Sequence, residues 1–335
     1  MKKIVRWLSI VLLLFLLLAG VMFASLSIGA AHVPFAKTLS LILQGDDGSA
    51  YYSILFNIRL PRIIIGFAVG SALSLAGVIL QGMFRNSLVE PYTLGISGGA
   101  ALGVCLGIVL RINNVFGAIT IPALGFLGAI AVIWLIYFLS IRKDALQMQG
   151  ILLTGVMISF ICSSLFMLVM ALARMEDLHG IIFWTMGSLE QSQGKLIKAI
   201  VFVSIGGLCA AYAFCKDLNA FALGEEEALH LGISTQTTKK ILFVITSLLT
   251  GASVSVAGII GFVGLVIPHC MRILFGSDHR ILLVSAYLAG GIFLIICDTI
   301  ARTLIAPLEL PVGVVTGILG GTVFIYILSR KQGGR

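Results

Sequence analysis

Residues that could do chemistry are few in this chain, and none has the spacing of a catalytic or metal site. The five histidines, His32, His179, His230, His269 and His279, form neither an HxxxH nor an HExxH pattern. No combination of Ser, His and Asp, and no pair of carboxylates, supports an enzyme. The six cysteines lie scattered in apolar segments without a CxxC pair, which favours reduced packing residues. We therefore expect no catalytic residue and no metal ligand.

A phosphate-binding loop is also absent from the sequence. Gly187 precedes Gly194-Lys195, but six residues separate the glycines instead of four, and neither Ser nor Thr follows the lysine. We expect this chain to bind no nucleotide and no other cofactor.

Charged residues cluster beside two apolar runs. Arg59, Pro61 and Arg62 open a run that continues to Met83. Further on, Asp298 and Arg302 stand one helical turn apart and can pair. Charges inside membrane segments suggest function, although a pair near the end of a span at the membrane interface also has an ordinary structural explanation.

Glycines and a proline interrupt another apolar run. Gly258, Gly261 and Gly264 recur every three residues, and Pro268 follows. These residues weaken a straight helix. Inside a membrane, irregular backbone persists where protein or a water-filled cavity satisfies it. The pattern predicts an element that lines or gates a channel, while a close crossing of two helices is equally compatible with it.

The longest polar segment of the second half covers residues 216–240. Gly224 precedes Glu225-Glu226-Glu227, and acids in a first turn favour a helix. Gly232 is a suitable residue to end that helix. Two short helices here could dock a soluble partner, and a solvated loop is an equally good interpretation.

The composition indicates a membrane protein. Of the 335 residues, 59% are hydrophobic and 11% are charged, whereas soluble domains average about 25% charge. Long continuous apolar runs argue against a β-barrel. We predict an all-α polytopic fold with about ten spans: Val5–Ile28, Ile63–Met83, Leu94–Leu110, Leu124–Ser140, Leu152–Ala173, Leu196–Phe214, Ile241–Ile260, a short Gly261–Phe275, Ile281–Ile300 and Val312–Leu328.

The segments between the spans have different expected roles. Residues 29–58 are expected to form an exposed loop, partly helical around Pro34–Leu43, and residues 174–194 a loop along the membrane interface. Arg142-Lys143-Asp144 is expected to form a short charged turn. The first apolar run is longer than the core of a signal peptide and is taken as a retained helix.

Charge predicts the orientation. With the N-terminus inside, 14 of the 22 Lys and Arg lie on the cytoplasmic side and 8 outside. This rule also explains the net charge of +8 without nucleic acid. Both termini are then cytoplasmic, while Arg59, Arg62 and Arg302 lie on the outer face.

A short internal match hints at a repeat. Ser74-Leu-Ala-Gly77 resembles Ser255-Val-Ala-Gly258, in spans that would run in opposite directions. This is the pattern of an inverted repeat in transporters, although chance similarity between apolar helices is as good an explanation.

Across nearly its whole length the chain resembles the FecCD family of ABC-importer permeases, which includes vitamin B12, haem and iron-siderophore permeases. The resemblance rests on RLPR at Arg59–Arg62, LAGVILQG to RNSLVEP at Leu75–Pro91, LGISGGA at Leu94–Ala100, LNAFALGEEEALHLG at Leu218–Gly232, GFVGLVIPHCMR at Gly261–Arg272, GSDHR at Gly276–Arg280, DTIAR at Asp298–Arg302 and ELPVG at Glu309–Gly313. One departure is Ser87, where the family more often has proline.

The resemblance implies a single permease domain over residues 1–335 in the cytoplasmic (inner) membrane. It implies a homodimer with a central path, two separate ATP-binding subunits that use the ATP, and an extracytoplasmic substrate-binding protein. Arg59, Arg62 and Arg302 would receive acidic residues of that protein. The cytoplasmic coupling segment within 216–240 would contact the ATPase, through Leu223, Gly224, Glu225, Ala228, Leu231 and Gly232.

The path or its gate is assigned on the same basis, to Gln81, Asn86, Pro91, Gly95, Gly98, Gly261, Gly264 and Pro268. The expected cargo is an iron(III) chelate of the siderophore type, with cobalamin or haem as the alternative. An ion-coupled secondary transporter remains the competing class, and it would need a membrane-buried carboxylate near the bilayer centre.

Overall fold

The computed structural model describes residues 2–112, 117, 119–142, 145–146, 148–190 and 193–332. Among these residues, 7 helices are long and apolar enough to cross a membrane, and three shorter apolar helices accompany them: Ile96–Val109, Val263–Phe275 and Val312–Ile327. The predicted all-α polytopic fold with about ten spans is confirmed. Lys143 and Asp144 of the predicted charged turn lie outside the described residues.

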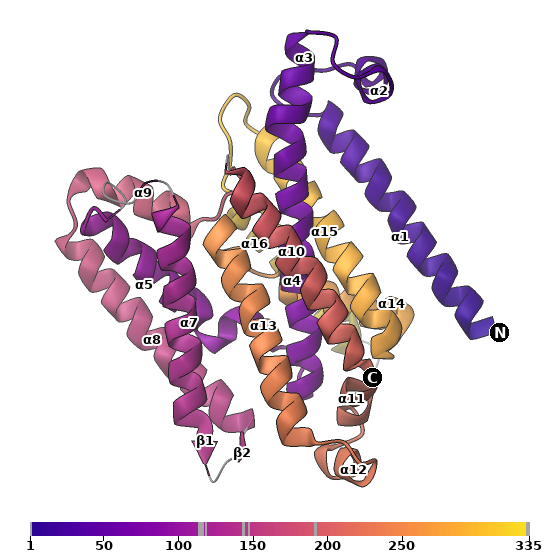
Figure 1. Cartoon of the computed structure of the whole chain (residues 1–335), viewed down its shortest axis with the longest axis vertical. Coiled ribbons are helices and arrows are strands. Elements are labelled where there is room, and N and C mark those ends of the chain that lie inside the picture. Colours follow the sequence, from indigo (N-terminus) through magenta and orange to yellow (C-terminus); the bar gives the residue numbers. More distant parts are fainter. Residues whose placement is uncertain are drawn as a thin grey trace.

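The elements follow one another along the chain as labelled in Figure 1: α1 (Lys2–Ser27), α2 (Phe35–Gln44), α3 (Ala50–Tyr52), the π-helix η1 (Ser53–Arg59), α4 (Leu60–Phe84), the 3-10 helix η2 (Pro91–Leu94), α5 (Ile96–Val109), α7 (Thr120–Ser140), β1 (Ile141–Arg142), β2 (Ala145–Leu146), α8 (Met148–Leu172), α9 (Met175–Thr185), α10 (Gly194–Ala213), α11 (Cys215–Phe221), α12 (Glu225–His230), α13 (Thr235–Ala257), α14 (Val263–Phe275), α15 (His279–Thr303) and α16 (Val312–Gln332). The strands β1 and β2 form a two-residue antiparallel pair.

Helix α4 is the centre of the bundle. It packs against α15, α10, α13 and α14, and nearly all of its residues from Arg62 to Met83 are buried. Its sequence is apolar on every side, as a helix surrounded by other helices requires. Figure 1 shows α10 and α13 in front of it and α15 beside it.

Glycines allow the closest of these contacts. A Cβ atom built on Gly70 would lie 2.3 Å from the carbonyl oxygen of Gly290 in α15, and one on Gly77 would lie 1.9 Å from that of Gly264 in α14. Larger residues would force the helices apart, which is the usual reason for small residues at helix contacts in membranes.

The predicted exposed loop over residues 29–58 is wrong in its second half. Helix α2 accounts for the expected helical part, but residues 50–59 are also helical and run without a break into α4. Leu55 is fully buried, and Tyr52 and Phe56 pack against the core. Arg59 and Arg62 therefore do not begin the helix, which starts before them at Ala50. Their hydrogen-bond partners lie inside the protein. Likewise, much of the predicted loop 174–194 is helix α9.

A second group of helices, α5, α7 and α8, lies to one side of α4, with α9 across its end (Figure 1). Gly99 of α5 and Gly128 of α7 meet backbone to backbone, because a Cβ on either would lie within 2.5 Å of the other's carbonyl oxygen. This group joins the α4 bundle mainly through α13, which packs against α7 and α5.

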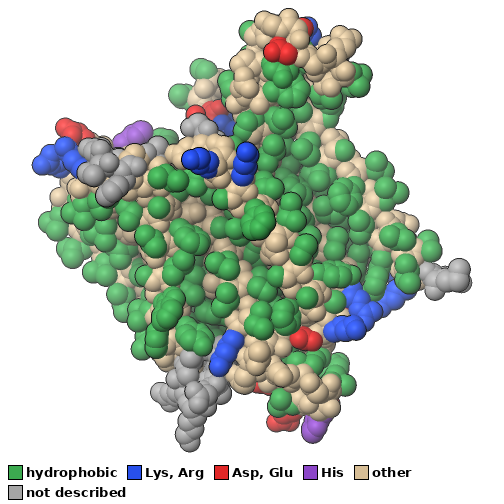
Figure 2. All heavy atoms as spheres, viewed as in Figure 1, with side chains coloured by type: hydrophobic (Ala, Val, Ile, Leu, Met, Phe, Trp, Pro, Cys, Tyr) green, Lys and Arg blue, Asp and Glu red, His purple; other side chains and the backbone are tan. Residues whose placement is uncertain are grey.

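The molecule has two polar ends. We call the end that carries Arg59, Arg62 and Arg302 the arginine end, and the end that carries α11 and α12 the coupling end. They lie at the top and bottom of Figure 1, and Figure 2 shows hydrophobic side chains covering the region between them.

The suggested inverted repeat stays a prediction. The two matching segments occupy different local structures: Ser74 to Gly77 lies within α4, whereas Gly258 follows the end of α13 with a positive φ of 69°.

Candidate functional site

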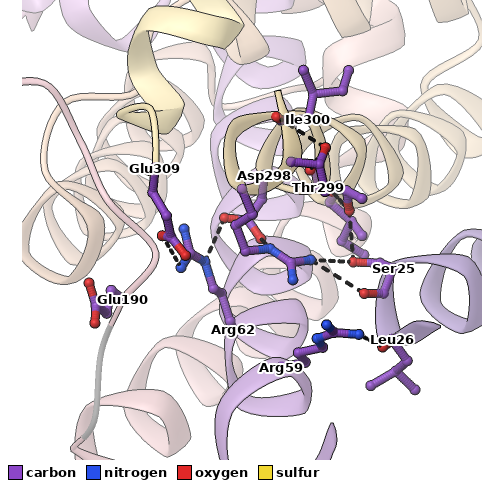
Figure 3. Close-up of polar contacts among 12 residues, drawn as sticks. Ser25, Leu26, Arg59, Arg62, Glu190, Asp298, Thr299, Ile300 and Glu309 are labelled. Atoms are coloured by element: carbon purple, nitrogen blue, oxygen red, sulfur yellow. Dashed lines mark hydrogen bonds and ion pairs between the residues drawn. The ribbon is translucent and has the colours of Figure 1, made fainter. Parts of the chain in front are cut away.

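Asp298 is the hub of a buried charge network at the arginine end (Figure 3). Arg62 donates from Nε to Asp298 Oδ1 over 2.7 Å, and Arg302 donates from Nε to Oδ2 over 2.9 Å. Arg62 also donates from Nη1 to Glu309 Oε2 over 2.6 Å. The expected pairing of Asp298 with Arg302 is therefore present, and one aspartate bridges two helices, α4 and α15.

Helix α1 supplies the remaining partners. Arg302 Nη2 donates to Ser25 Oγ over 2.9 Å. Arg59 donates from Nη1 to the carbonyl oxygens of Leu26 and Ser27, at 2.5 and 2.9 Å, and from Nη2 to that of Ala31. The end of α1 and the chain after it thus satisfy Arg59 without a carboxylate.

The three arginines are not free at the surface. Arg59, Arg62 and Arg302 are 4%, 8% and 5% exposed. Burying a charge costs several kcal/mol unless partners compensate it, and the network provides them. These side chains therefore lie in the interior of one end of the molecule. Their place on the outer side of the membrane stays a prediction. Their role in docking a binding protein stays a prediction, and the contacts described here would have to rearrange before an acidic partner could reach them.

A cavity of about 370 Å³ opens beside this network. Arg62 and Glu309 line one side of it, and Trp184, Ser188 and Glu190 line another. Glu309 has a side chain 43% exposed, and Glu190 is exposed as well. The open face of the arginine end therefore presents acidic groups, with a guanidinium behind them.

The predicted interruption after α13 is present. Helix α13 ends at Ala257, and α14 begins at Val263. Between them, Gly258 and Phe262 both have positive φ values. A positive φ is rare for a bulky residue and stores strain that the surroundings must hold. We call residues 258–262 the break.

Neighbouring segments hold the break on two sides. The Tyr92 hydroxyl accepts from the Ile260 N–H over 3.1 Å, and the Glu90 carboxylate accepts from the Phe262 N–H. On the other side, the Ser188 N–H donates to the Ala257 carbonyl oxygen over 2.9 Å. The break is thus fixed by the loop before α5 and by the loop after α9.

Five of the residues predicted for the path or its gate lie in or near the break. Gln81 of α4 donates to the carbonyl oxygens of Gly264 and Leu265 over 3.3 Å. Pro91 touches Gly264, and Pro268 is buried within α14. Gly261 lies within the break with open space around it. Their assignment to a path or gate stays a prediction.

The other three predicted path residues lie elsewhere. Gly95, with φ of 78°, and Gly98 pack against α8 near Ser159 and Cys162. Asn86 lies on the exposed turn after α4, where its Oδ1 accepts from the Leu88 N–H over 2.9 Å. Sequence proximity to the other candidates did not bring these residues to the break.

The coupling segment forms the two short helices predicted for it, α11 and α12. Gly224 and Gly232 flank α12 with φ values of 137° and 80°, conformations that suit glycine. Ala228 is fully buried and anchors α12, whereas Leu223, Leu229 and Leu231 are 66%, 54% and 63% exposed. Three exposed leucines on one short segment are an apolar contact surface of the kind that a protein partner covers.

Glu225 has a role that the sequence did not reveal. It accepts from Lys239, whose side chain is only 4% exposed, and so ties α12 to α13. Leu229 was not among the predicted contact residues, although it is exposed like Leu223 and Leu231. On a short helix, a residue next to a buried one points in a different direction, so the position of Leu229 beside Ala228 could have indicated its exposure.

At the same end, Asp278 begins α15 by accepting from the Arg280 N–H over 3.2 Å. Partial burial alone would raise its pKa, but hydrogen bonds from Asn219 and Lys3 outweigh burial and hold the pKa of this carboxyl below its ordinary value. Asp278 is therefore ionised at neutral pH.

Comparison with known proteins gives a consistent result. The model of the FecCD transport family matches residues 14–330. The hemin transport system permease protein HmuU of Yersinia pestis is 36% identical over 95% of this chain and 95% of its own length. The vitamin B12 import system permease protein BtuC of Citrobacter koseri is 36% identical, over 99% of this chain and 96% of its own.

A solved structure has the same fold. It is described as a metal-chelate type ABC transporter in an inward-facing conformation, and it superposes with a TM-score of 0.83 at 28% sequence identity. The match covers 96% of this chain and 99% of that one.

Proposed function

This chain belongs to the FecCD transport family, and from that membership we propose that it is the membrane-spanning permease subunit of an ATP-driven importer in the cytoplasmic (inner) membrane. The observation that carries the proposal is the presence of two specialised ends on one body, which among the described residues contains seven long and three shorter apolar helices. One end holds buried arginines beside a cavity lined by two glutamates, and the other exposes leucines on and beside the short helix α12.

The proposed cargo is an iron(III) chelate of the siderophore type, and cobalamin or haem is the alternative. All three are bulky metal complexes, in keeping with relatives named for haem and vitamin B12. Among the described residues no group of three or more His, Cys, Asp or Glu could hold a metal ion, so we propose that the cargo passes through this chain as an intact complex.

The two ends would meet different partners. We assign the arginine end to the outside, where a substrate-binding protein docks, and the coupling end to the cytoplasm, where an ATPase contacts Leu223, Leu229 and Leu231. Two copies of the chain with two ATPases would surround a central path, and both termini would be cytoplasmic. These assignments extend the charge bias of the sequence.

The proposed mechanism follows the contacts. ATP closes the two ATPases, and their movement reaches α13 through the Glu225–Lys239 pair. Helix α13 ends at the break, so displacement there would shift α14 against α4 and switch the opening of the path from outside to inside. No covalent step occurs in this chain.

An ion-coupled secondary transporter is the competing function. Such a transporter needs a buried carboxylate that can bind and release an ion. Asp298 of α15 is buried, but two arginines neutralise it, which leaves Asp298 poorly suited to that task.

The test is uptake in a strain that lacks this gene, comparing labelled ferric siderophore, haem and cobalamin. We expect loss of ferric siderophore uptake, restored by the wild-type chain but not by a charge-reversed Arg59/Arg62/Arg302 variant that still reaches the membrane. Loss of only haem uptake, or of only cobalamin uptake, would identify that compound as the cargo in place of a ferric siderophore. Uptake that persists without ATP, driven by an ion gradient, would overturn the importer.

A further inference from the structure

A second cavity, of about 370 Å³, lies at the coupling end between the ends of α4, α14 and α15. Its lining includes Arg85, Arg272, Ser277 and His279, and none of its lining residues is acidic. Gln81 and Asn86, which are predicted for the path or its gate, also line it, whereas the transport function described above gives no role to Arg85, Arg272 or His279.

The two arginines of this cavity lack carboxylate partners among the described residues. Arg272 is half-buried in α14, and its only described side-chain contact is a donation from Nη1 to Gln81 Oε1 over 3.3 Å. Arg85 is exposed at the rim of the cavity. The contrast with Arg62 and Arg302 is direct, because those guanidiniums share Asp298. A partly buried guanidinium without a counter-charge favours an anion beside it.

His279 supplies a third group, and its neighbours define its protonation. The Asn219 side-chain oxygen accepts from the His279 backbone N–H over 2.8 Å, and His279 Nδ1 lies 2.8 Å from the same oxygen. Asn219 Nδ2 meanwhile donates to Asp278 over 3.1 Å, which fixes the amide orientation. Nδ1 must therefore carry the proton of the neutral ring, and Nε2 is left as an acceptor.

That acceptor is buried and has no hydrogen-bond partner within the described part of the chain. The residue is 3% exposed. A Cβ atom on Gly82 would lie 2.9 Å from Nε2, so any side chain at position 82 would crowd this nitrogen. Gly82 also lines the cavity. A buried acceptor without a partner costs free energy, which a ligand that donates a proton to it would recover.

We propose that this cavity binds a phosphate group that retains one P–O–H, either inorganic phosphate or a phosphate monoester. The guanidiniums of Arg272 and Arg85 take the charged oxygens, for which their planar donors are well suited. The remaining P–O–H donates to His279 Nε2. A phosphate monoester has its second pKa near 6, so part of it keeps this proton at neutral pH, whereas sulfate and phosphodiesters do not.

The site is connected to the coupling segment. Ala222 also lines the cavity, and Arg85 Nη1 approaches Gly224 at the start of α12. A bound phosphate would therefore join the turn after α4 and the helices α14 and α15 to the segment that precedes α12. This inference concerns the chain itself and does not depend on the cargo or on the proposed transport.

The test uses the full-length chain in nanodiscs of phosphatidylcholine, with radiolabelled inorganic phosphate as the probe at neutral pH. We expect saturable binding, with sulfate a poorer competitor than phosphate. Arg272→Gln should weaken phosphate binding roughly tenfold or more, the usual loss for a contact to a charged group. Arg280→Gln is the matched control, since Arg280 is exposed nearby and does not line the cavity.

Two further variants separate the site from the fold. Arg272→Lys keeps the positive charge and should bind phosphate better than Arg272→Gln. This comparison separates loss of charge from loss of structure. Gly82→Ala places a methyl group against Nε2 and should reduce the preference for phosphate over sulfate. Each variant is first checked for an unchanged thermal unfolding profile.

The source of the phosphate group is resolved by a second lipid. If phosphatidic acid in the nanodisc displaces the labelled phosphate, the natural ligand is a lipid headgroup; if it does not, the ligand is a soluble phosphate. Absence of saturable binding by the wild-type chain overturns the proposal. Equal loss of binding in Arg272→Gln and Arg280→Gln also overturns it, because binding would then reflect the overall charge of that end.

Discussion

The arginine end and the coupling end both contain guanidinium groups away from bulk water, but they differ in whether a carboxylate accompanies the charge. At the arginine end, Asp298 is shared by Arg62 and Arg302 at 2.7 and 2.9 Å. At the coupling end, Arg272 reaches a glutamine and no described carboxylate. The first arrangement is internally compensated and stabilises the fold, whereas the second leaves charge available for a ligand or partner.

Removing the shared carboxylate should have the largest effect. Asp298→Asn leaves the buried Arg302 without its carboxylate and Arg62 with only the partly exposed Glu309. Breaking a buried ion pair costs about 3–5 kcal/mol. We expect a lower yield of folded protein and a large drop in the unfolding free energy, measured in detergent. Glu309→Gln removes a partly exposed carboxylate from the same network and should cost much less. Equal stability of Asp298→Asn and wild type would show that the arginine end is not held by this network.

The close contact between α4 and α14 is the next feature to test. A Cβ at Gly77 would lie 1.9 Å from the Gly264 carbonyl oxygen, so Gly77→Ala must push α14 away from α4 near the break. We expect a loss of roughly 1–3 kcal/mol in unfolding free energy. Gly206→Ala in α10 is the control, because no atom lies within 4 Å of the added methyl group. A neutral Gly77→Ala would mean that the α4–α14 contact is looser than described.

The sequence was sufficient for features that depend on local pattern. Apolar runs predicted the spans, and Gly224 with Gly232 predicted the bounds of α12. The glycine spacing was compatible with an interruption or a close helix crossing, and both are present: the break at residues 258–262 and the contact of Gly264 with Gly77. Each of these signals is contained in a few neighbouring residues, where backbone preference and hydrophobicity decide the outcome.

Features that depend on distant partners could not be predicted in the same way. The burial of Arg59 is stabilised by carbonyl oxygens about thirty positions earlier, at the end of α1, and no local pattern announces such partners. The cavity at the coupling end likewise combines Arg85, Arg272 and His279 from three separate segments. Motif reading identified stretches that contain all three but gave no reason to connect them.

An exposed ion pair at the coupling end should contribute far less to stability than the buried pairs of Asp298. Lys3 and Asp278 are paired at 3.1 Å, with side chains 69% and 24% exposed. Lys3→Gln should cost at most about 1 kcal/mol, because water screens exposed pairs. The pKa of Asp278 is lowered in the folded state, so its contribution is present at neutral pH. It should fade as the pH falls through the range of about 4 and below, where the carboxyl takes up a proton.

Truncating the exposed leucines of the coupling end should change stability least, although it should disrupt the proposed contact with the ATPase. Leu229→Ala with Leu231→Ala truncates side chains that are already exposed, so the unfolding free energy should change by no more than roughly 0.5 kcal/mol. If an ATPase covers these leucines, the pair of substitutions should abolish its co-purification and ATP-dependent uptake. Leu308→Ala is the matched control, since Leu308 is 69% exposed at the arginine end. Retained co-purification in the double variant, or equal loss in the control, would remove the leucines of the coupling end from the proposed interface, because exposed hydrophobic area alone does not identify the partner that covers it.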